Sequence, residues 1–205
     1  VIKPMNGTQL CGSALTIDET NGVLYLVSNY AVESYLISSF ASTSSPLWFV
    51  QYPDPHPPFM SFCTPSPVSV DPRAGLVSFT FTCEQYGSNV VALDMNTGVI
   101  LWNFLFPTGT TQSPIASTPL LHNAARAAFV SMAPYGLTVI DYNGTVITNG
   151  SYALSQASGT TPSLWIDSNT NSPYIIYQTM AAQQTYFELM ATDLSGNMQE
   201  PWSIA

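Results

Sequence analysis

The stretch that decides the fold runs from Ala92 to Trp102 and reads ALDMNTGVILW. Its apolar opening ends at Asp94, which is typical of a β-strand that enters a tight turn. Asp94 and Asn96 can cap that turn through their side chains, and Gly98 accepts a positive φ. A second apolar run then leads to the tryptophan. The stretch therefore predicts a β-hairpin whose indole packs against a neighbouring unit.

The same phrase recurs further along the chain as VIDYNGTVI around Asp141 and as ATDLSGNM around Asp193, so that the three aspartates are 47 and 52 residues apart. A second phrase lies between these copies, with a small or proline-containing lead-in followed by alternating apolar residues. Two phrases with one period indicate four units of about 50 residues. The second phrase ends at Asp18, Asp71, Asn123 and Asp167, with spacings of 53, 52 and 44 residues.

Short β-branched and aromatic runs, separated by turn residues, recur throughout the chain, and no stretch keeps apolar residues at helical spacing for three turns. Both observations indicate an all-β fold. Four antiparallel strands in each unit are typical of propeller blades, which bury their faces only against their neighbours. We expect one all-β, propeller-like domain over residues 13–205, as a closed four-blade ring or as part of a larger ring completed by further sequence or a second copy. Residues 1–12 form an N-terminal arm outside the repeats. The expected blades are 13–53, 66–107, 116–154 and 160–205, with a Pro-rich connection at 53–67.

The pattern Ala-x-Asp-x-x-Thr-Gly-x-x-x-Trp that ends at Trp102 resembles the docking motif of the PQQ-like, or quinoprotein alcohol dehydrogenase-like, propeller repeats. Trp48 and Trp202 keep the tryptophan in two further blades, whereas the third blade has Thr148 or Asn149 at that place. The resemblance implies a structural role in docking one blade on the next. The residues with this expected role are Ala92, Asp94, Gly98, Trp102, Trp48 and Trp202.

The resemblance also implies a possible relation to enzymes that bind PQQ together with calcium, a catalytic aspartate and usually two adjacent cysteines. Here no two cysteines are adjacent, and four units are about half the number of blades in those enzymes. Cations for the cofactor's carboxylates are limited to Lys3, Arg73 and Arg126. We therefore expect no cofactor and no enzyme activity.

Two Asp-rich turns, DMNTG and DSNTN, alternate oxygen ligands as calcium loops do. A helix–loop–helix calcium site needs glutamate at its twelfth position, where Leu105 and Gln178 stand. Turn formation is the better interpretation, so we expect no metal site. A weak divalent site at Asp167, Asn169 and Asn171 stays open as the alternative.

The sequence gives little support for a hydrolase, because the chain has no GxSxG nucleophile elbow and only two isolated histidines. His122 and Trp165 lie on expected innermost strands, where either could face the channel and a ligand. A lone histidine at such a place is more often structural. His56 stands in PDPHPP, which predicts an extended connection or, alternatively, a polyproline ligand or a site of proline hydroxylation and sugar attachment.

The charge balance excludes several partners. Three Lys and Arg against twelve Asp and Glu give a net charge of -9, with a pI near 4.1. The cationic footprint that nucleic acid requires is missing, and anionic membrane surfaces are disfavoured. Apolar runs such as residues 22–27 are far shorter than the 18 residues or more of a membrane span.

Hydroxyl and amide groups replace the charges, with 24 serines, 21 threonines and 12 asparagines, which is typical of secreted glycoproteins. N-glycosylation sequons stand at Asn6, Asn143 and Asn149, each with glycine next to asparagine, which indicates exposed turns.

The three cysteines cannot all pair with one another. Cys63 precedes an expected innermost strand and Cys83 follows its antiparallel neighbour, so the two lie at the same blade end and we expect a disulfide between them. Cys11 is then free or bonded outside this chain.

These observations favour a non-enzymatic, extracellular glycoprotein that acts as an interaction or structural scaffold. Its expected partners are proteins, above all copies of itself in an oligomer or fibre, and attached glycans. The arm at residues 1–10 could lie on or complete a sheet of an adjacent subunit. No signal-like stretch opens the chain at Val1, so any leader is removed or the chain is part of something longer. The alternative is a glycan- or small-ligand-binding propeller, and a fragment of a PQQ-dependent dehydrogenase is less favoured.

Overall fold

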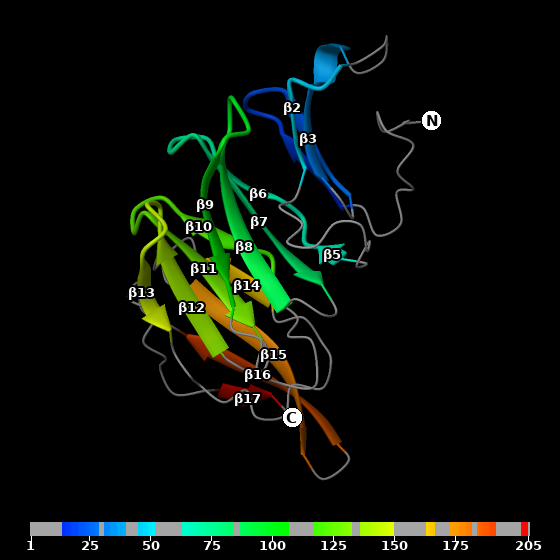
Figure 1. Cartoon of the computed structure of the whole chain (residues 1–205). Coiled ribbons are helices and arrows are strands. Elements are labelled where there is room, and N and C mark those ends of the chain that lie inside the picture. The colour runs from blue at the N-terminus through cyan, green and yellow to red at the C-terminus, as the bar shows by residue number, and fades with distance from the viewer. Residues whose placement is uncertain are drawn as a thin grey trace.

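The computed structural model describes most of the chain as four antiparallel sheets (Figure 1). Side-chain surroundings are described within these segments up to residue 147. The predicted arm, His56, Asp193 and the alternative divalent site lie outside the described residues. The described segments are 14–28, 31–39, 45–51, 63–83, 87–106, 117–132, 136–149, 163–166, 173–181, 184–191 and 202–204.

Each sheet is built from consecutive antiparallel strands, as the alternating patterns predict. The first sheet contains β1 (Ala14–Asp18), β2 (Val23–Val27), β3 (Ala31–Leu36) and β4 (Trp48–Gln51), with a short 3₁₀ helix, η1 (Ile37–Ser39), after β3. The second contains β5 (Cys63–Pro65), β6 (Ser69–Asp71), β7 (Leu76–Cys83), β8 (Gly87–Asp94) and β9 (Ile100–Leu105). The third contains β10 (Leu120–His122), β11 (Ala127–Met132), β12 (Gly136–Asp141) and β13 (Val146–Asn149). The fourth contains β14 (Ser163–Ile166), β15 (Pro173–Ala181), β16 (Gln184–Ala191) and β17 (Trp202–Ile204).

The second sheet departs from the four-strand expectation, because its first strand is divided into β5 and β6, which both pair with β7. Between them, Ser66 replaces the regular ladder: its N–H donates to the Thr80 carbonyl at 2.8 Å, and its Oγ accepts from the Thr80 N–H at 3.0 Å. The sheet therefore begins at Cys63, inside the segment predicted to be only a connection.

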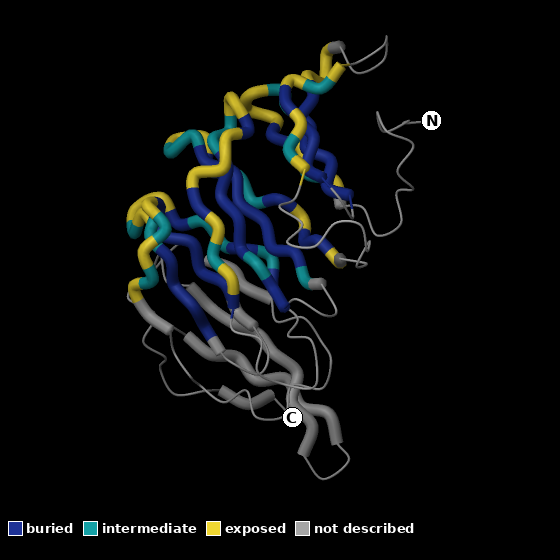
Figure 2. The backbone as a smooth tube through the Cα atoms, viewed as in Figure 1, coloured by how far each residue is buried: buried dark blue, intermediate teal, exposed yellow. Residues whose placement is uncertain are grey.

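The four sheets follow one another in chain order, and Figure 1 shows the first and the fourth at opposite ends of the row. Figure 2 shows that the middle strands of the described sheets are buried while the turns are exposed. Successive side chains of a strand point to opposite faces of its sheet, and a sheet enclosed between two others needs apolar residues on both faces. The central strands are therefore buried along nearly their whole length, as β8 is.

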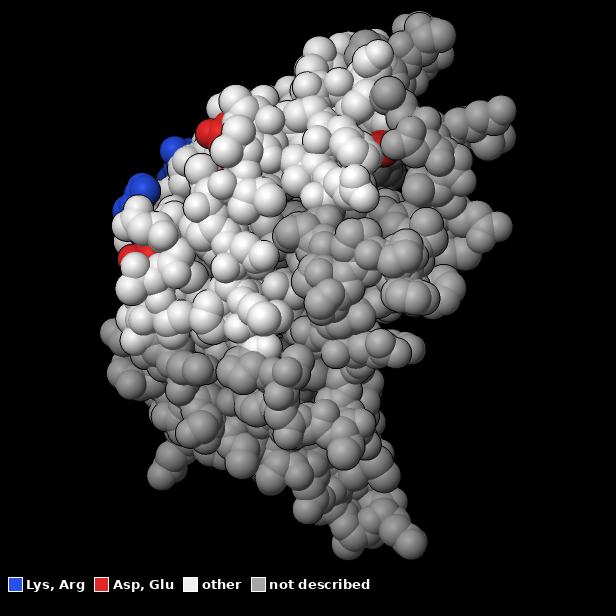
Figure 3. Space-filling model, in the orientation of Figure 1, with Lys and Arg blue, Asp and Glu red and all other residues white. Residues whose placement is uncertain are grey.

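The described surface carries few charges. Figure 3 shows only a few charged side chains on the described part of this face, blue for arginine at its left edge and red for acidic residues, with uncharged atoms between them. The whole chain has only 15 charged residues among 205. Soluble domains usually place charge on about 25 to 35% of surface positions.

Candidate functional site

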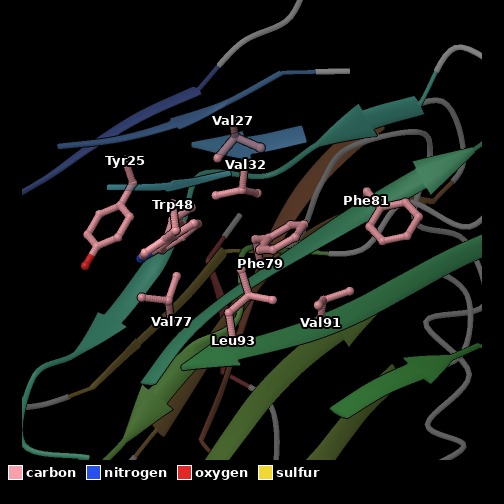
Figure 4. Close-up of a cluster of buried hydrophobic side chains, with 10 residues drawn as sticks. Tyr25, Val27, Val32, Trp48, Val77, Phe79, Phe81, Val91 and Leu93 are labelled. Carbon is pink, nitrogen blue, oxygen red and sulfur yellow. The ribbon is translucent and has the colours of Figure 1, made fainter. Parts of the chain in front are cut away.

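The joints between successive sheets hold most of the residues that the sequence singles out. At the outer end of the first joint, Trp48 Nε1 donates to the Met95 carbonyl at 2.9 Å. At the second joint, Trp102 Nε1 donates to the Tyr142 carbonyl at 3.1 Å. Each tryptophan thus docks on the turn of the following sheet, as the repeat phrase predicts, and both indoles are buried. Figure 4 shows Trp48 among apolar side chains of the first and second sheets.

The receiving turn is built by its aspartate. Asp94 Oδ1 accepts from the backbone N–H groups of Asn96 at 3.0 Å and Thr97 at 2.8 Å, and from the Thr97 hydroxyl at 2.8 Å. The Thr97 bonds are the main reason that the pKa of Asp94 is lowered from its ordinary value. Asp141 repeats the turn by accepting from the N–H groups of Asn143 and Thr145. The Asp94 carboxylate therefore caps this turn. Asn96, which was expected to cap it through its side chain, contributes its backbone N–H instead.

The glycine of this turn leaves space for the indole. Gly98 has a φ of +71°, and a Cβ added there would lie 2.8 Å from Trp48 Cδ2. Gly144 has a φ of +89°, and its added Cβ would lie 2.7 Å from Trp102 Cβ. Both the backbone conformation and the close approach therefore require glycine.

The inner ends of the sheets are joined by hydroxyl groups. Thr16 Oγ1 donates to the Val68 carbonyl at 3.0 Å, and Ser69 Oγ donates to the Pro119 carbonyl. The donors lie on the first strands of their sheets, and the acceptors immediately precede β6 and β10. The segments that carry the second phrase are therefore neighbours in successive sheets.

A buried polar cluster around Asp71 also joins the second and third sheets, and sequence reasoning did not find it. Asp71 Oδ2 accepts from the Tyr142 hydroxyl at 2.7 Å and from Asn123 Nδ2 at 3.0 Å. Its Oδ1 accepts from the N–H groups of Arg73 and Ala74. The one available signal was the 52-residue spacing between Asp71 and Asn123.

Burial opposes ionisation of the Asp71 carboxyl, but the hydrogen bonds from Tyr142, Asn123 and the backbone outweigh it, so its pKa is lowered from 3.8. The pKa of Tyr142 is raised by burial and by its bond to Asp71. The Arg126 guanidinium lies 5.4 Å from the Tyr142 ring centroid. Stability from Asp71 is therefore present above about pH 4 and is lost as the pH falls through the folded-state pKa.

Replacing Tyr142 with phenylalanine tests this cluster. We expect the free energy of unfolding near pH 6 to fall by about 1.5 to 3 kcal/mol, because a hydrogen bond to a buried carboxylate is lost. The decline in stability below about pH 4 should also become shallower, because the folded-state pKa of Asp71 rises toward its unfolded value. Urea unfolding at several pH values measures both effects.

Tyr25 provides the matched control for that substitution. Its hydroxyl is buried and has no hydrogen-bond partner among the described residues, and burial with the nearby Asp18 charge raises its pKa to about 12. Tyr25→Phe should therefore change stability by less than about 0.5 kcal/mol or increase it. Equal losses for the two phenylalanine variants would contradict the role given to Asp71.

His122 takes the place of the turn-capping aspartates. Asp18 pairs with Val23 and Asp71 with Leu76, and His122 pairs with Ala127 after a turn of the same length. Its Nδ1 accepts from the Ala125 N–H at 3.0 Å, and the side chain is 2% exposed. In the third copy of the second phrase, the position of Asp18 and Asp71 is therefore held by His122 and not by Asn123, one residue later. Histidine can take this place because its imidazole nitrogen accepts the backbone hydrogen bond that a carboxylate oxygen accepts in the other sheets.

The remaining predicted tryptophan and sequon positions lie in the third and fourth sheets or outside the described residues. Trp165 lies on β14, and Trp202 on β17 pairs with Leu189. Thr148 is the residue at the tryptophan position of the third sheet, since it pairs with Val139 as Trp102 pairs with Ala92. Asn143 is exposed in its turn, Asn149 ends β13, and Asn6 and Cys11 lie outside the described residues.

Cys63 and Cys83 stand directly opposite each other in the register of β5 and β7. Opposed residues of antiparallel strands have Cα separations of about 4.5 to 5.5 Å, within the range of disulfides. The register thus supports the proposal that the two cysteines are bonded.

A disulfide between them closes a loop whose ends are 20 residues apart, so we expect Cys63→Ser to lower the free energy of unfolding by about 3 kcal/mol. Cys83→Ser should cost the same, and the double variant no more. Thiol titration of the unfolded, unreduced protein should find one thiol per chain. Three thiols in protein purified from an oxidising host would contradict the bond.

In the part of the chain that the structure describes, no group of three or more His, Cys, Asp or Glu side chains could hold a metal ion. Within the same segments, no helix is long and apolar enough to cross a membrane.

No protein-family model matches this chain, and no curated protein matches it. Among solved structures, it is similar to the periplasmic gluconolactonase PpgL of Pseudomonas aeruginosa, with a TM-score of 0.63 and 15% identity, over 93% of this chain and 53% of that one. It is also similar to quinohemoprotein alcohol dehydrogenase from Comamonas testosteroni, with a TM-score of 0.59 and 14% identity, over 89% and 33% of the two chains.

A third similar structure is the C-terminal domain of PilY1 from Pseudomonas aeruginosa, with a TM-score of 0.53 and 14% identity, over 88% of this chain and 47% of that one. The chain therefore spans between a third and about half of the length of these proteins. At such low identity the similarity shows the fold alone. Together with the four antiparallel sheets, it confirms the predicted β-propeller fold class.

Proposed function

We propose that this protein is a non-enzymatic interaction scaffold whose partners are proteins. The observation that carries the proposal is the use of its buried polar side chains. Asp71 binds groups from two sheets, His122 and Asp18 cap turns, and the hydroxyl of Thr16 joins inner strands. These groups are engaged in ordering turns and in joining neighbouring sheets, which is the chemistry of a framework.

We further assign the repeats to the PQQ-like type. The motif from Ala92 to Trp102 supports this assignment, because its Asp94 turn and Gly98 receive one tryptophan while its own tryptophan docks on the next sheet. The assignment concerns the repeat and its docking, and it carries no cofactor with it.

The same proposal includes secretion and glycosylation. Asn143 supports it as an exposed sequon residue whose turn is ordered by Asp141. The sparse charge, the many hydroxyl groups and the opposed positions of Cys63 and Cys83 are features of proteins from oxidising, extracellular surroundings. Glycans would keep such a weakly charged surface soluble.

Protein purified from a eukaryotic secretory host tests the proposal. We expect an intact mass above 22.2 kDa that enzymatic removal of N-glycans lowers, and sedimentation as an assembly larger than one chain. Asn143→Gln should remove one glycan. An unmodified monomer at high concentration would contradict the proposal. Saccharide density near Trp165 in soaked crystals would instead favour the ligand-binding alternative.

A further inference from the structure

The first sheet contains the backbone position that receives tryptophan in the second and third sheets. The Ile37 N–H donates to the Gly22 carbonyl at 2.9 Å. The same backbone bond joins Met95 with Gly75 in the second sheet and Tyr142 with Arg126 in the third, each at 2.9 Å. Ile37 therefore corresponds to Met95 and Tyr142, whose carbonyls accept an indole N–H from the preceding sheet.

The inner acceptor position is repeated as well. Val68 and Pro119, which accept the hydroxyl bonds, each stand three residues before the turn cap of their sheet. Leu15 stands three residues before Asp18 and so occupies this position in the first sheet. The first sheet thus has both positions through which the later sheets bind a preceding blade.

These two positions are exposed in the first sheet. Leu15 is 51% and Ile37 43% exposed, whereas their counterparts Val68 and Tyr142 are 3% and 7% exposed. Ile17, two residues after Leu15 on β1, is 52% exposed. Leu24, Leu26 and Tyr35 are buried at the centre of the same face, where the Tyr35 hydroxyl donates to Glu33. Apolar surface is therefore exposed at the two ends of this face, at Leu15, Ile17 and Ile37, whereas its centre is buried within the chain.

The fourth sheet carries residues that fit these positions. Trp165 on β14 pairs with Tyr174 as Thr16 pairs with Tyr25, and it precedes Asp167 by two residues as Thr16 precedes Asp18. Trp202 lies on β17, the outermost strand. Indole N–H groups are donors only, and the positions at Leu15 and Ile37 present carbonyl acceptors.

We infer that the fourth sheet of a second copy docks on this face of the first sheet, with β14 at Leu15 and β17 at Ile37. The inference rests on the proposed scaffold function and names its partner. The chain's own fourth sheet lies at the opposite end of the row (Figure 1). A reciprocal contact closes two copies into one ring of eight sheets.

Sedimentation velocity and light scattering across a concentration series test the inference on the deglycosylated chain. The wild-type protein should reach about twice its 22.2 kDa mass. The double variant L15E/I17E and the single variant W202A should each weaken dimerisation about 30-fold or more, because each disrupts one of the two proposed contact points of every joint. The control L105E adds a charge at a residue that is 56% exposed on β9 and should change nothing.

A mixture of L15E/I17E with W202A provides the decisive measurement. Each variant keeps one intact surface, so an equal mixture should form heterodimers through one joint while each variant alone stays monomeric. Thermal unfolding confirms that the variants fold. A wild-type monomer would overturn both this inference and the scaffold proposal. A wild-type dimer that neither variant weakens would overturn the inference alone, since the copies would then associate through another surface.

Discussion

Trp102→Ala is expected to lower the free energy of unfolding by about 3 to 5 kcal/mol, the range for truncating a large buried aromatic residue. The indole is 9% exposed and packs with residues of the second and third sheets, including Val130 and Ile140. Its loss opens a cavity at the joint and also leaves the Tyr142 carbonyl without its N–H donor. Since each blade is stabilised by its neighbours, the unfolding transition should also broaden.

Urea unfolding followed by circular dichroism measures this effect, with Leu101→Ala as the matched control. Leu101 precedes the tryptophan on the same strand and is 49% exposed, so its truncation should cost less than about 0.5 kcal/mol. Trp102→Phe should fall between the two, because it keeps an aromatic ring and loses the N–H donor. Similar losses for Trp102→Ala and Leu101→Ala would show that the indole does not hold the joint.

Gly98→Ala is expected to cost about 2 to 5 kcal/mol, although it adds a single methyl group. About 1 to 2 kcal/mol comes from placing a side chain at a φ of +71°. A further 1 to 3 kcal/mol, roughly, comes from overpacking, since the new Cβ would lie 2.8 Å from the Trp48 ring. The clash meets the indole face and the turn backbone, which have little freedom to move apart.

Gly75→Ala separates these two causes. Gly75 has a φ of +66°, and an added Cβ there meets nothing within 4 Å, so only the backbone cost of about 1 to 2 kcal/mol should appear. In a double-mutant cycle, Trp48→Ala should remove the excess cost of Gly98→Ala, because the clashing ring is absent. Equal costs at the two glycines, or additive effects in the cycle, would contradict the close contact.

The local phrases were predictable because they act over a few residues. The turn at Asp94 is formed by bonds to Asn96 and Thr97, two and three residues away, and such turns leave a signature in sequence. Apolar alternation likewise marks the strands. The structure confirms the hairpins that follow from these patterns, including the one whose aspartate is Asp141.

The candidate site was predictable in part. The repeat period placed Trp48 and Trp102 at joints between blades, and both lie there. The Asp71 cluster was not predicted, because Tyr142 is 71 residues from Asp71 and no local pattern connects them. His122 was not recognised as a turn cap, because its nitrogen replaces an aspartate oxygen and the phrase was aligned one residue too late.

By itself, the sequence determined the all-β class, the period of about 50 residues and the turns, since period-2 patterning and side-chain capping are local effects. Only the tertiary structure decided which carbonyl each indole meets, how Asp71 joins two sheets and where β5 pairs. These contacts connect residues about 20 to 70 positions apart. They depend on how two folded sheets approach each other, and that approach is set by the packing of whole faces.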